Sequence, residues 1–203
     1  MGATNEQSRT AHQGHSQHHR EGGIARIIET GTYLGTTTAF FAEFGVPVIT
    51  AERDPDLARD AAKRLQNWSN VEVRGDDSVR VLQQLVREPI DRSVPTFFYL
   101  DAHAQKHLPV REETELAIAY FPRAIVMIDD FQVPDDPEYG FGERRLSLGY
   151  LLQGSLRQLT VFFPSARALT ETGARRGCVV LTADPAAASI LGKLRGLRRW
   201  LMR

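Results

Sequence analysis

The chain is poor in several features that would narrow its function at once. It has one cysteine, Cys178, which excludes an internal disulfide and suits a reducing compartment. No apolar run approaches the length of a membrane span, and no charged-then-apolar leader resembles a signal peptide. Lys plus Arg and Asp plus Glu both number 25, so the net charge gives no general attraction to nucleic acid. We therefore expect a soluble cytoplasmic protein that binds neither membranes nor nucleic acid.

The length of 203 residues suffices for one domain with a substantial core. Residues 1–22 are polar and have no apolar periodicity, which predicts a flexible leader ahead of a domain at 23–203. Several histidines lie in this leader, but no cysteine or carboxylate cluster accompanies them, so a solvated tail is favoured over a metal site. These histidines are His12, His15, His18 and His19.

Short apolar runs alternate with segments of helical character along the first two thirds of the domain. The runs predict buried strands at 24–28, 47–52, 71–73, 96–100 and 124–128. Helices are predicted around Phe40, Phe41 and Phe44, whose spacing is typical of one buried helix face, after Asp54-Pro55, at 79–86 and at 112–120. This alternation predicts a parallel sheet with helices on both faces.

The last third of the chain is less regular. We expect a helix at 146–152, strands at 159–163 and 178–182, and a final helix with its apolar face at 190–201. The two strands lack a helix between them, so they could pair as an antiparallel hairpin at the sheet edge. The fold class is therefore α/β: a single Rossmann-like domain with a mostly parallel seven-stranded sheet, helices on both faces and an antiparallel strand at the edge.

A glycine turn at Glu29–Thr37 follows the first predicted strand and leads into a helix. Gly31 and Gly35 allow a sharp turn and close approach, and a helix N-terminus offers free amide donors. The spacing departs from the G-x-G-x-x-G of dinucleotide folds, and no Walker motif is present. Glu52, which ends the second strand, is placed to accept hydrogen bonds from two ribose hydroxyls.

An acidic residue ends each of the five predicted strands: Glu29, Glu52, Asp76, Asp101 and Asp129. Ligands bind at the carboxyl ends of the strands in open parallel sheets. Capping of the following helices explains one or two such acids, but not readily all five. The sequence therefore indicates a functional edge.

Three carboxylates are expected to crowd one part of this edge, because Asp101 and Asp129-Asp130 end neighbouring strands. Adjacent strands lie about 4.8 Å apart, and like charges at that range repel unless a cation or proton intervenes. Oxygen ligands favour Mg²⁺, with Mn²⁺ or Ca²⁺ as other divalent choices. In the alternative, metal-free site, Asp129 or Asp130 is a turn residue and Asp101 binds an amine or water.

The ordered motifs E-T-G-T-Y-L-G-T-T, A-E-R-D-P, G-D-D-S, Y-L-D-A-H and I-D-D-F resemble those of class I methyltransferases that use S-adenosylmethionine (SAM). More narrowly, they are similar to metal-dependent O-methyltransferases of the catechol and macrolide-sugar type, over 24–131. The resemblance implies that the methionine and ribose part of SAM lies against Glu29, Gly31, Thr32, Gly35 and Thr36. It implies that Glu52 holds the ribose, and that Asp76 with Asp77 or Ser78 lies beside the adenine.

His103 follows Asp101 on the same loop and is the candidate general base, because histidine accepts a proton near neutral pH. The resemblance supports it, since relatives carry a Lys, Asp or His base there. Lys106 and His107 are alternatives, and a histidine that merely packs over the cofactor is a further one. Asp101 is counted with the catalytic, cofactor-binding and metal-binding residues. Arg175 or Arg176 could bind an acidic substrate group, but a plain surface hairpin is equally expected there.

The function that these residues indicate is SAM-dependent, Mg²⁺-dependent transfer of a methyl group to a hydroxyl of a sugar or secondary metabolite. The alternatives are a metal-independent methyltransferase, a non-catalytic SAM sensor or complex subunit, and an NAD or nucleotide-sugar enzyme. A nucleic-acid N-methyltransferase is disfavoured, because Leu100–His103 replaces the Asn/Asp-Pro-Pro-aromatic stretch of those enzymes. The short polar leader could leave the site open, or a homo-oligomer could complete it.

Overall fold

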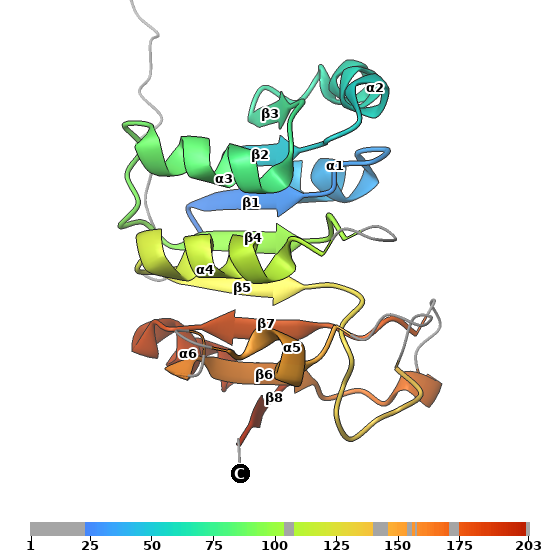
Figure 1. The fold of residues 1–203 in the computed structure, drawn as a ribbon, viewed down its shortest axis with the longest axis vertical. Helices are drawn as coiled ribbons and strands as arrows, with labels where there is room; N and C mark the ends of the chain where they lie inside the picture. The colour runs from blue at the N-terminus through green and yellow to red at the C-terminus, as the bar shows by residue number, and fades with distance from the viewer. Residues whose placement is uncertain are drawn as a thin grey trace, which may run out of the picture.

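One eight-stranded sheet organises the described part of the chain, with strand order β3-β2-β1-β4-β5-β7-β6-β8 (Figure 1). The computed structural model describes residues 23–103, 108–139, 146–153, 156, 158–170 and 175–201. The leader predicted at 1–22 therefore lies outside the described residues. Strands β1 to β5 are parallel, β7 runs antiparallel to β5 and β6, and β8 runs antiparallel to β6.

The strands fall close to the predicted runs. Their ends are level, because β1 pairs with β2 and β4 up to Thr30, and β4 pairs with β5 up to Leu100 and Ile128. The strands in the middle of the sheet are apolar because both faces of the sheet are covered. The bounds are β1 Arg26–Thr30, β2 Val48–Ala51, β3 Val71–Arg74, β4 Thr96–Leu100, β5 Ala124–Ile128, β6 Thr160–Pro164, β7 Val179–Thr182 and β8 Leu197–Trp200.

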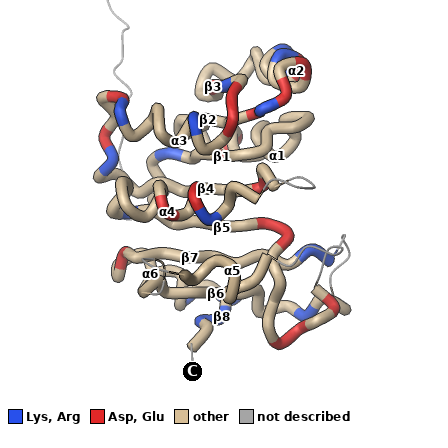
Figure 2. The backbone as a smooth tube through the Cα atoms, in the orientation of Figure 1, with Lys and Arg blue, Asp and Glu red and all other residues tan. Residues whose placement is uncertain are grey.

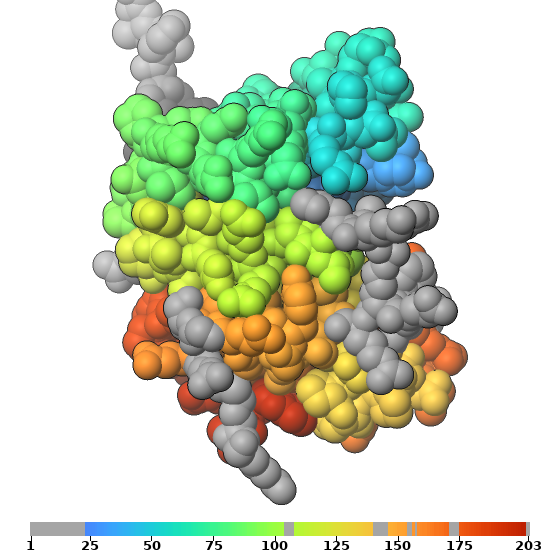
Figure 3. Space-filling model, viewed as in Figure 1, coloured from blue at the N-terminus to red at the C-terminus, as the bar shows by residue number. Residues whose placement is uncertain are grey.

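Helices cover both faces of the sheet, as predicted. The main core lies beneath α3 and α4, which pack side by side in Figure 3, and α1 and α6 pack on the opposite face. The helices are α1 Thr36–Ala42, α2 Pro55–Leu65, α3 Ser78–Arg87, α4 Val110–Tyr120, α5 Leu148–Leu151 and α6 Pro185–Leu191, with a 3₁₀ turn η2 at Ala168–Thr170. None of the described helices has the length and apolarity needed to cross a bilayer.

The predicted helix at 190–201 is wrong. Helix α6 ends at Leu191, and 197–200 form β8, an eighth strand instead of a helical turn. Trp200 packs edge-on against Phe163, and the Arg198 guanidinium lies over the same ring. This cross-strand packing overrides the helical spacing of Leu194, Leu197 and Leu201. Leu201 is 75% exposed. The predicted hairpin of β6 and β7 is present, but β8 forms the sheet edge.

Helix α1 is present as predicted, but the aromatic residues in it and just after it do not share one buried face. Phe41 is buried under β4, where it packs edge-on against Phe97 and Tyr99. Phe40 and Phe44 are 55% and 62% exposed. The prediction that all three mark a buried face is therefore wrong for two of them.

Candidate functional site

The glycine turn after β1 brings the ends of three strands together. Gly31 has a φ of +88°, and a Cβ atom there would lie 2.6 Å from the carbonyl oxygen of Asp101. Its amide donates to the carbonyl of Ala51 at 2.9 Å. Glycine is needed at this position both for the left-handed backbone and for the contact between the ends of β1 and β4.

Gly35 shapes the turn from the other side. It has a φ of +75° at the start of α1, and its Cβ position would meet the Leu65 side chain at 3.1 Å. Gly35 and Thr36, both predicted to contact SAM, lie outside the lining of the cavity described next. Both residues instead lie at the start of helix α1.

A cavity of about 590 Å³ opens at the carboxyl ends of β1, β2 and β4. This volume lies within the range of small-molecule sites. The sequence-predicted residues that line it are Gly31, Glu52, Asp77, Ser78 and Asp101.

Glu52 is oriented by backbone amides. Its Oε2 accepts from the amide of Tyr33 at 2.8 Å, and its Oε1 accepts from the amide of Asp54 at 2.9 Å. Each carboxylate oxygen has a second lone pair. Glu52 therefore lines the cavity with acceptor capacity left for two hydroxyls.

Glu29 and Thr32 support the turn from inside instead of lining the cavity. The Glu29 carboxylate accepts from the hydroxyls of Thr38 and Thr50, the latter at 2.7 Å, and Thr32 is bonded to Thr50 at 2.6 Å. Burial raises the pKa of Glu29, against these hydrogen bonds. The pair forms a buried polar brace beneath the predicted cofactor site.

The start of α3 forms the far wall of the cavity. Asp77 caps this helix by accepting from the amide of Val79 at 3.1 Å, and Asp77 and Ser78 line the cavity. Asp76, predicted with them, accepts from the Asp77 amide at 2.7 Å and is not part of the lining.

A compact cluster of Asp101, His103 and Asp130 lies where β4 and β5 end. One ligand atom from each lies within 4.8 Å of the others. His103 Nε2 is 3.7 Å from both Asp101 Oδ1 and Asp130 Oδ2. Figure 2 shows the acidic positions that follow β5. Lys106 and His107, the alternative bases, lie outside the described residues.

Asp129, predicted as a third metal ligand, is not in this cluster. Its Oδ2 accepts from the hydroxyl of Tyr99 at 2.8 Å. Successive side chains along a strand point to opposite faces, and Asp130 with a φ of +50° turns the chain away. The alternation alone, applied to Asp129-Asp130, could have separated the two carboxylates.

Burial and neighbouring charges shift the pKa values of residues in this cluster. Burial, followed by the charge of Asp129, raises the pKa of Asp101 to about 7. Burial lowers the pKa of His103, but the carboxylates of Asp130 and Asp101 outweigh it, so the net shift is upward. Protons therefore stay on the cluster at higher pH than on isolated groups.

Arg176 adds a positive charge that sequence reasoning left outside the site. Its Nε and Nη1 lie 3.4 Å from the two carboxylate oxygens of Asp130. Arg176 precedes β7, which pairs with β5, and this antiparallel insertion carries it to the cluster. Asp130 is therefore shared between His103 and Arg176.

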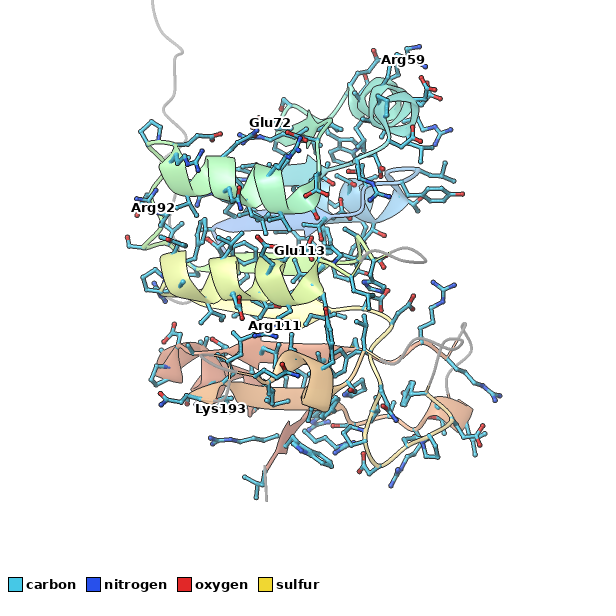
Figure 4. The ribbon with its side chains drawn as sticks, viewed as in Figure 1. Arg59, Glu72, Arg92, Arg111, Glu113 and Lys193 are labelled. Atoms are coloured by element: carbon cyan, nitrogen blue, oxygen red, sulfur yellow. The ribbon has the colours of Figure 1, made fainter. Side chains whose placement is uncertain are left out.

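Glu113 is a buried carboxyl that the sequence did not indicate. It is 1% exposed and lies between α3 and α4 (Figure 4). Burial raises its pKa to about 7, while the hydroxyls of Ser78 and Thr30 act in the opposite direction. In the sequence it resembled an ordinary acid in the first turn of a helix. The structure places it directly behind the cavity wall at Ser78.

Known structures with the same fold support this picture of the architecture. An O-methyltransferase from Bacillus cereus, solved with S-adenosylhomocysteine (SAH), is 21% identical, with a TM-score of 0.57 over 77% of this chain and 73% of that one. A provisionally assigned O-methyltransferase from Klebsiella pneumoniae is 19% identical, with a TM-score of 0.54 over 79% and 73%. An rRNA methylase from Streptococcus thermophilus is 20% identical, with a TM-score of 0.50 over 78% and 87%.

No protein-family model and no curated protein sequence matches the chain. At these identities the structural matches establish the fold. The protein has the fold of class I SAM-dependent methyltransferases, which confirms the fold that the motifs indicated.

Proposed function

We propose that the protein is a SAM-dependent O-methyltransferase that acts on a hydroxyl of a small molecule with the help of a divalent cation. One observation carries the proposal: Asp101 belongs both to the lining of the 590 Å³ cavity and to the Asp101–His103–Asp130 cluster. A methyl donor in the cavity and an acceptor oxygen at the cluster would therefore be neighbours. That adjacency is what direct methyl transfer requires.

The cavity residues fit SAM. Glu52 has acceptor capacity for the ribose hydroxyls, and its geometry is fixed by two backbone amides. Gly31 leaves the floor free of side-chain atoms at the point where β1 meets β4. SAM supplies an electrophilic methyl group, and these residues hold and orient the molecule that carries it.

The cluster fits a divalent cation. Both imidazole nitrogens of His103 lack a hydrogen-bond partner among the described residues, so Nε2 is available as a ligand. Two carboxylates suit Mg²⁺ or Mn²⁺, and an imidazole ligand favours a transition metal, so the mixed set fits Mn²⁺ better than Mg²⁺. A cation held there would orient the acceptor hydroxyl and lower its pKa.

The protein's own residues have separable roles in this proposal. Asp101 and Asp130, with His103, would hold the cation, and Arg176, which lies beside Asp130, would compete with the cation for that carboxylate. In the transfer, the acceptor oxygen would bond to the methyl carbon as the carbon–sulfur bond breaks, and the hydroxyl proton would leave to solvent. Tyr99 keeps Asp129 turned away, and its own pKa is raised by burial and by that carboxylate, so its hydroxyl stays a donor.

A metal-independent version of the reaction is the second candidate. The observation that favours it is the charge of Arg176 beside Asp130, which together with a protonated His103 already neutralises the carboxylates. In this version, His103 first loses the proton on Nε2. Nε2 then accepts the proton of the acceptor hydroxyl. Removal of divalent cations would then leave turnover intact.

Calorimetric titration of metal-stripped full-length protein tests both versions. We expect SAH to bind, NAD not to bind, and Mg²⁺ or Mn²⁺ to give a separate heat that Asp130→Asn abolishes and Asp129→Asn retains. The Asp129 variant is the matched control, because that carboxylate bonds to Tyr99 outside the cluster. Loss of the cation heat in both variants would restore the sequence-based ligand set. SAH binding with no cation heat would support the metal-independent reaction, and absence of SAH binding would refute the proposed function.

A further inference from the structure

Glu113 carries a buried carboxyl group that the proposed reaction does not use. It belongs to the first turn of α4, is 1% exposed and lies beside α3 (Figure 4). Both helices bury apolar side chains there, such as Leu82 of α3 and Ala117 of α4. Glu112, in the same turn, is exposed and already places an acid at the helix N-terminus. The helix start therefore does not explain why Glu113 is buried.

Two hydroxyl groups from other elements approach the Glu113 carboxyl. Burial raises the pKa of Glu113, and the hydroxyls of Ser78 at the start of α3 and Thr30 at the end of β1 act against it. The charges of His103 and Asp77 act on it in opposite directions. Among the described residues, neither carboxyl oxygen of Glu113 nor the hydroxyl of Thr30 has a hydrogen-bond partner of normal geometry. Polar groups from three elements thus meet without being fully paired.

This meeting point is unfavourable for stability. A buried polar group that lacks a full partner loses its hydration without compensation, and an apolar side chain of similar shape would avoid that loss. Proteins keep such local conflicts mainly at functional sites. The surroundings of Glu113 indicate which site it serves.

Both hydroxyl neighbours of Glu113 belong to segments that build the candidate site. Ser78 lines the 590 Å³ cavity. Thr30 precedes Gly31 of the cavity floor, and its carbonyl oxygen accepts from the amide of Asp101 at 3.0 Å. One residue on each side therefore separates the Glu113 carboxyl from the cavity and from the residue that joins the cavity to the cluster.

We propose that Glu113 is a positioning residue of the methyl-donor cavity, which holds Ser78 at the cavity wall and Thr30 behind Asp101 through hydrogen bonds of its carboxyl group. This inference rests on the proposed function, because it assigns the cavity to SAM. A protonated carboxyl group can donate to one hydroxyl and accept from another. Hydrogen bonds at such sites are often long before a ligand binds and shorten in the complex.

Calorimetric titration of the full chain with SAH tests the proposal, at about pH 6, where the Glu113 carboxyl is protonated. Glutamine keeps one donor and one acceptor in the same shape, whereas methionine keeps only the length. We expect Glu113→Met to weaken SAH binding at least about tenfold and Glu113→Gln to keep it within about threefold. Glu112→Gln, in the same turn but exposed, is the matched control and should leave the affinity unchanged.

Denaturant unfolding of the same variants separates positioning from a structural role. We expect the unfolding midpoint of Glu113→Met to equal or exceed that of the wild type, because the variant no longer buries an incompletely paired carboxyl. Loss of SAH affinity with a parallel loss of stability would overturn the positioning role. Equal losses of affinity in Glu113→Gln and Glu113→Met would overturn the hydrogen-bonded role of the side chain.

A double-mutant cycle with Ser78→Ala tests the route to the cavity. Because Glu113 acts through Ser78 in the proposal, Ser78→Ala should cost at least about threefold less SAH affinity in the Glu113→Met background than in the wild type. Additive losses would overturn this route. Glu113→Leu takes the place of Glu113→Met if the latter fails to fold, and failure of both to fold would show that Glu113 serves the fold instead.

The outcomes also separate this inference from the proposed function. Equally tight SAH binding to the wild type and to folded Glu113→Met would overturn the positioning role and leave the proposed function standing. Absence of SAH binding to the wild type would overturn both.

Discussion

The two ends of the parallel strands carry hollows of similar size and opposite chemistry. The carboxyl-end cavity measures about 590 Å³ and presents carboxylates and a positive-φ glycine. A groove beside α1 at the amino ends, lined by residues such as Phe40, Phe44 and Phe97, measures about 510 Å³ and is wholly apolar. The carboxyl-end cavity is polar because the strands are parallel, so loops and helix N-termini gather at the edge where the strands end. Volume alone would not distinguish the two hollows. The chemistry of the lining residues does.

The largest expected effect comes from filling the cavity floor. Gly31→Ala places a Cβ 2.6 Å from the Asp101 carbonyl oxygen, whereas Gly45→Ala has nothing within 4 Å, and both have positive φ. We expect Gly45→Ala to cost about 1–2 kcal/mol of unfolding free energy from backbone strain. Gly31→Ala should cost about 4 kcal/mol, with loss of SAH binding. Denaturant unfolding and calorimetry measure the two, and equal costs would contradict the close-contact argument.

The pH dependence of stability should identify the carboxyl behind the cavity wall. The pKa of Glu113 is raised from 4.5 to about 7 in the folded state, so the folded protein binds the extra proton between these values. Wild-type stability is therefore fully present below about pH 4.5 and falls as the pH rises through about 7. Glu113→Gln removes this loss, so the variant should gain up to about 3 kcal/mol relative to wild type between pH 4.5 and 8. A difference that does not change with pH would show that Glu113 has an ordinary pKa.

Removing the carboxylate charge at Glu52 should weaken the binding of SAH specifically. Glu52→Gln replaces one acceptor oxygen by a donor that faces a backbone amide, and we expect SAH affinity to fall about 10- to 30-fold, or about 1.4–2 kcal/mol. Glu72→Gln, at an exposed residue of the neighbouring β3, is the control for a general charge effect. An unchanged SAH affinity would move the ribose away from Glu52.

The smallest expected effect concerns the competing arginine. Arg176→Gln should tighten cation binding by up to about fivefold, as expected for a partly exposed charge pair, and Arg175→Gln should leave it unchanged. Cation affinity should also rise as the pH rises through about 7, because Asp101 must lose its proton to bind. Calorimetry at several pH values measures both. Weaker cation binding in Arg176→Gln would mean that Arg176 supports the site.

Most of the parallel half could be predicted from the sequence. The predicted runs at 96–100 and 124–128 coincide with β4 and β5, and Asp54 caps α2 as expected, accepting from the amides of Asp56 and Leu57. These features are local, since apolar runs and capping residues act within a few positions. Because these signals are local, the sequence also predicts where the strands end and in which order the ends follow along the chain.

The features that were missed depend on contacts between distant segments. The spacing of Leu194, Leu197 and Leu201 suits a helix, yet Trp200 gains a partner on β6 only as a strand. The position of Arg176 beside Asp130 depends on β7 entering the sheet next to β5. Glu113 differs from an ordinary acid in the first turn of a helix only in its burial, which its neighbours along the chain do not reveal.

The central claim is that Asp101 joins the cofactor cavity to the cation cluster. It is tested most directly by measuring how Mn²⁺ relaxes the methyl signal of SAM, labelled with ¹³C at its methyl group, on the full-length protein. The proposal predicts strong relaxation in wild type and in Asp129→Asn, and its loss in Asp130→Asn with SAM still bound. Tight binding of both SAM and Mn²⁺ to the wild type without relaxation of the methyl signal would contradict it.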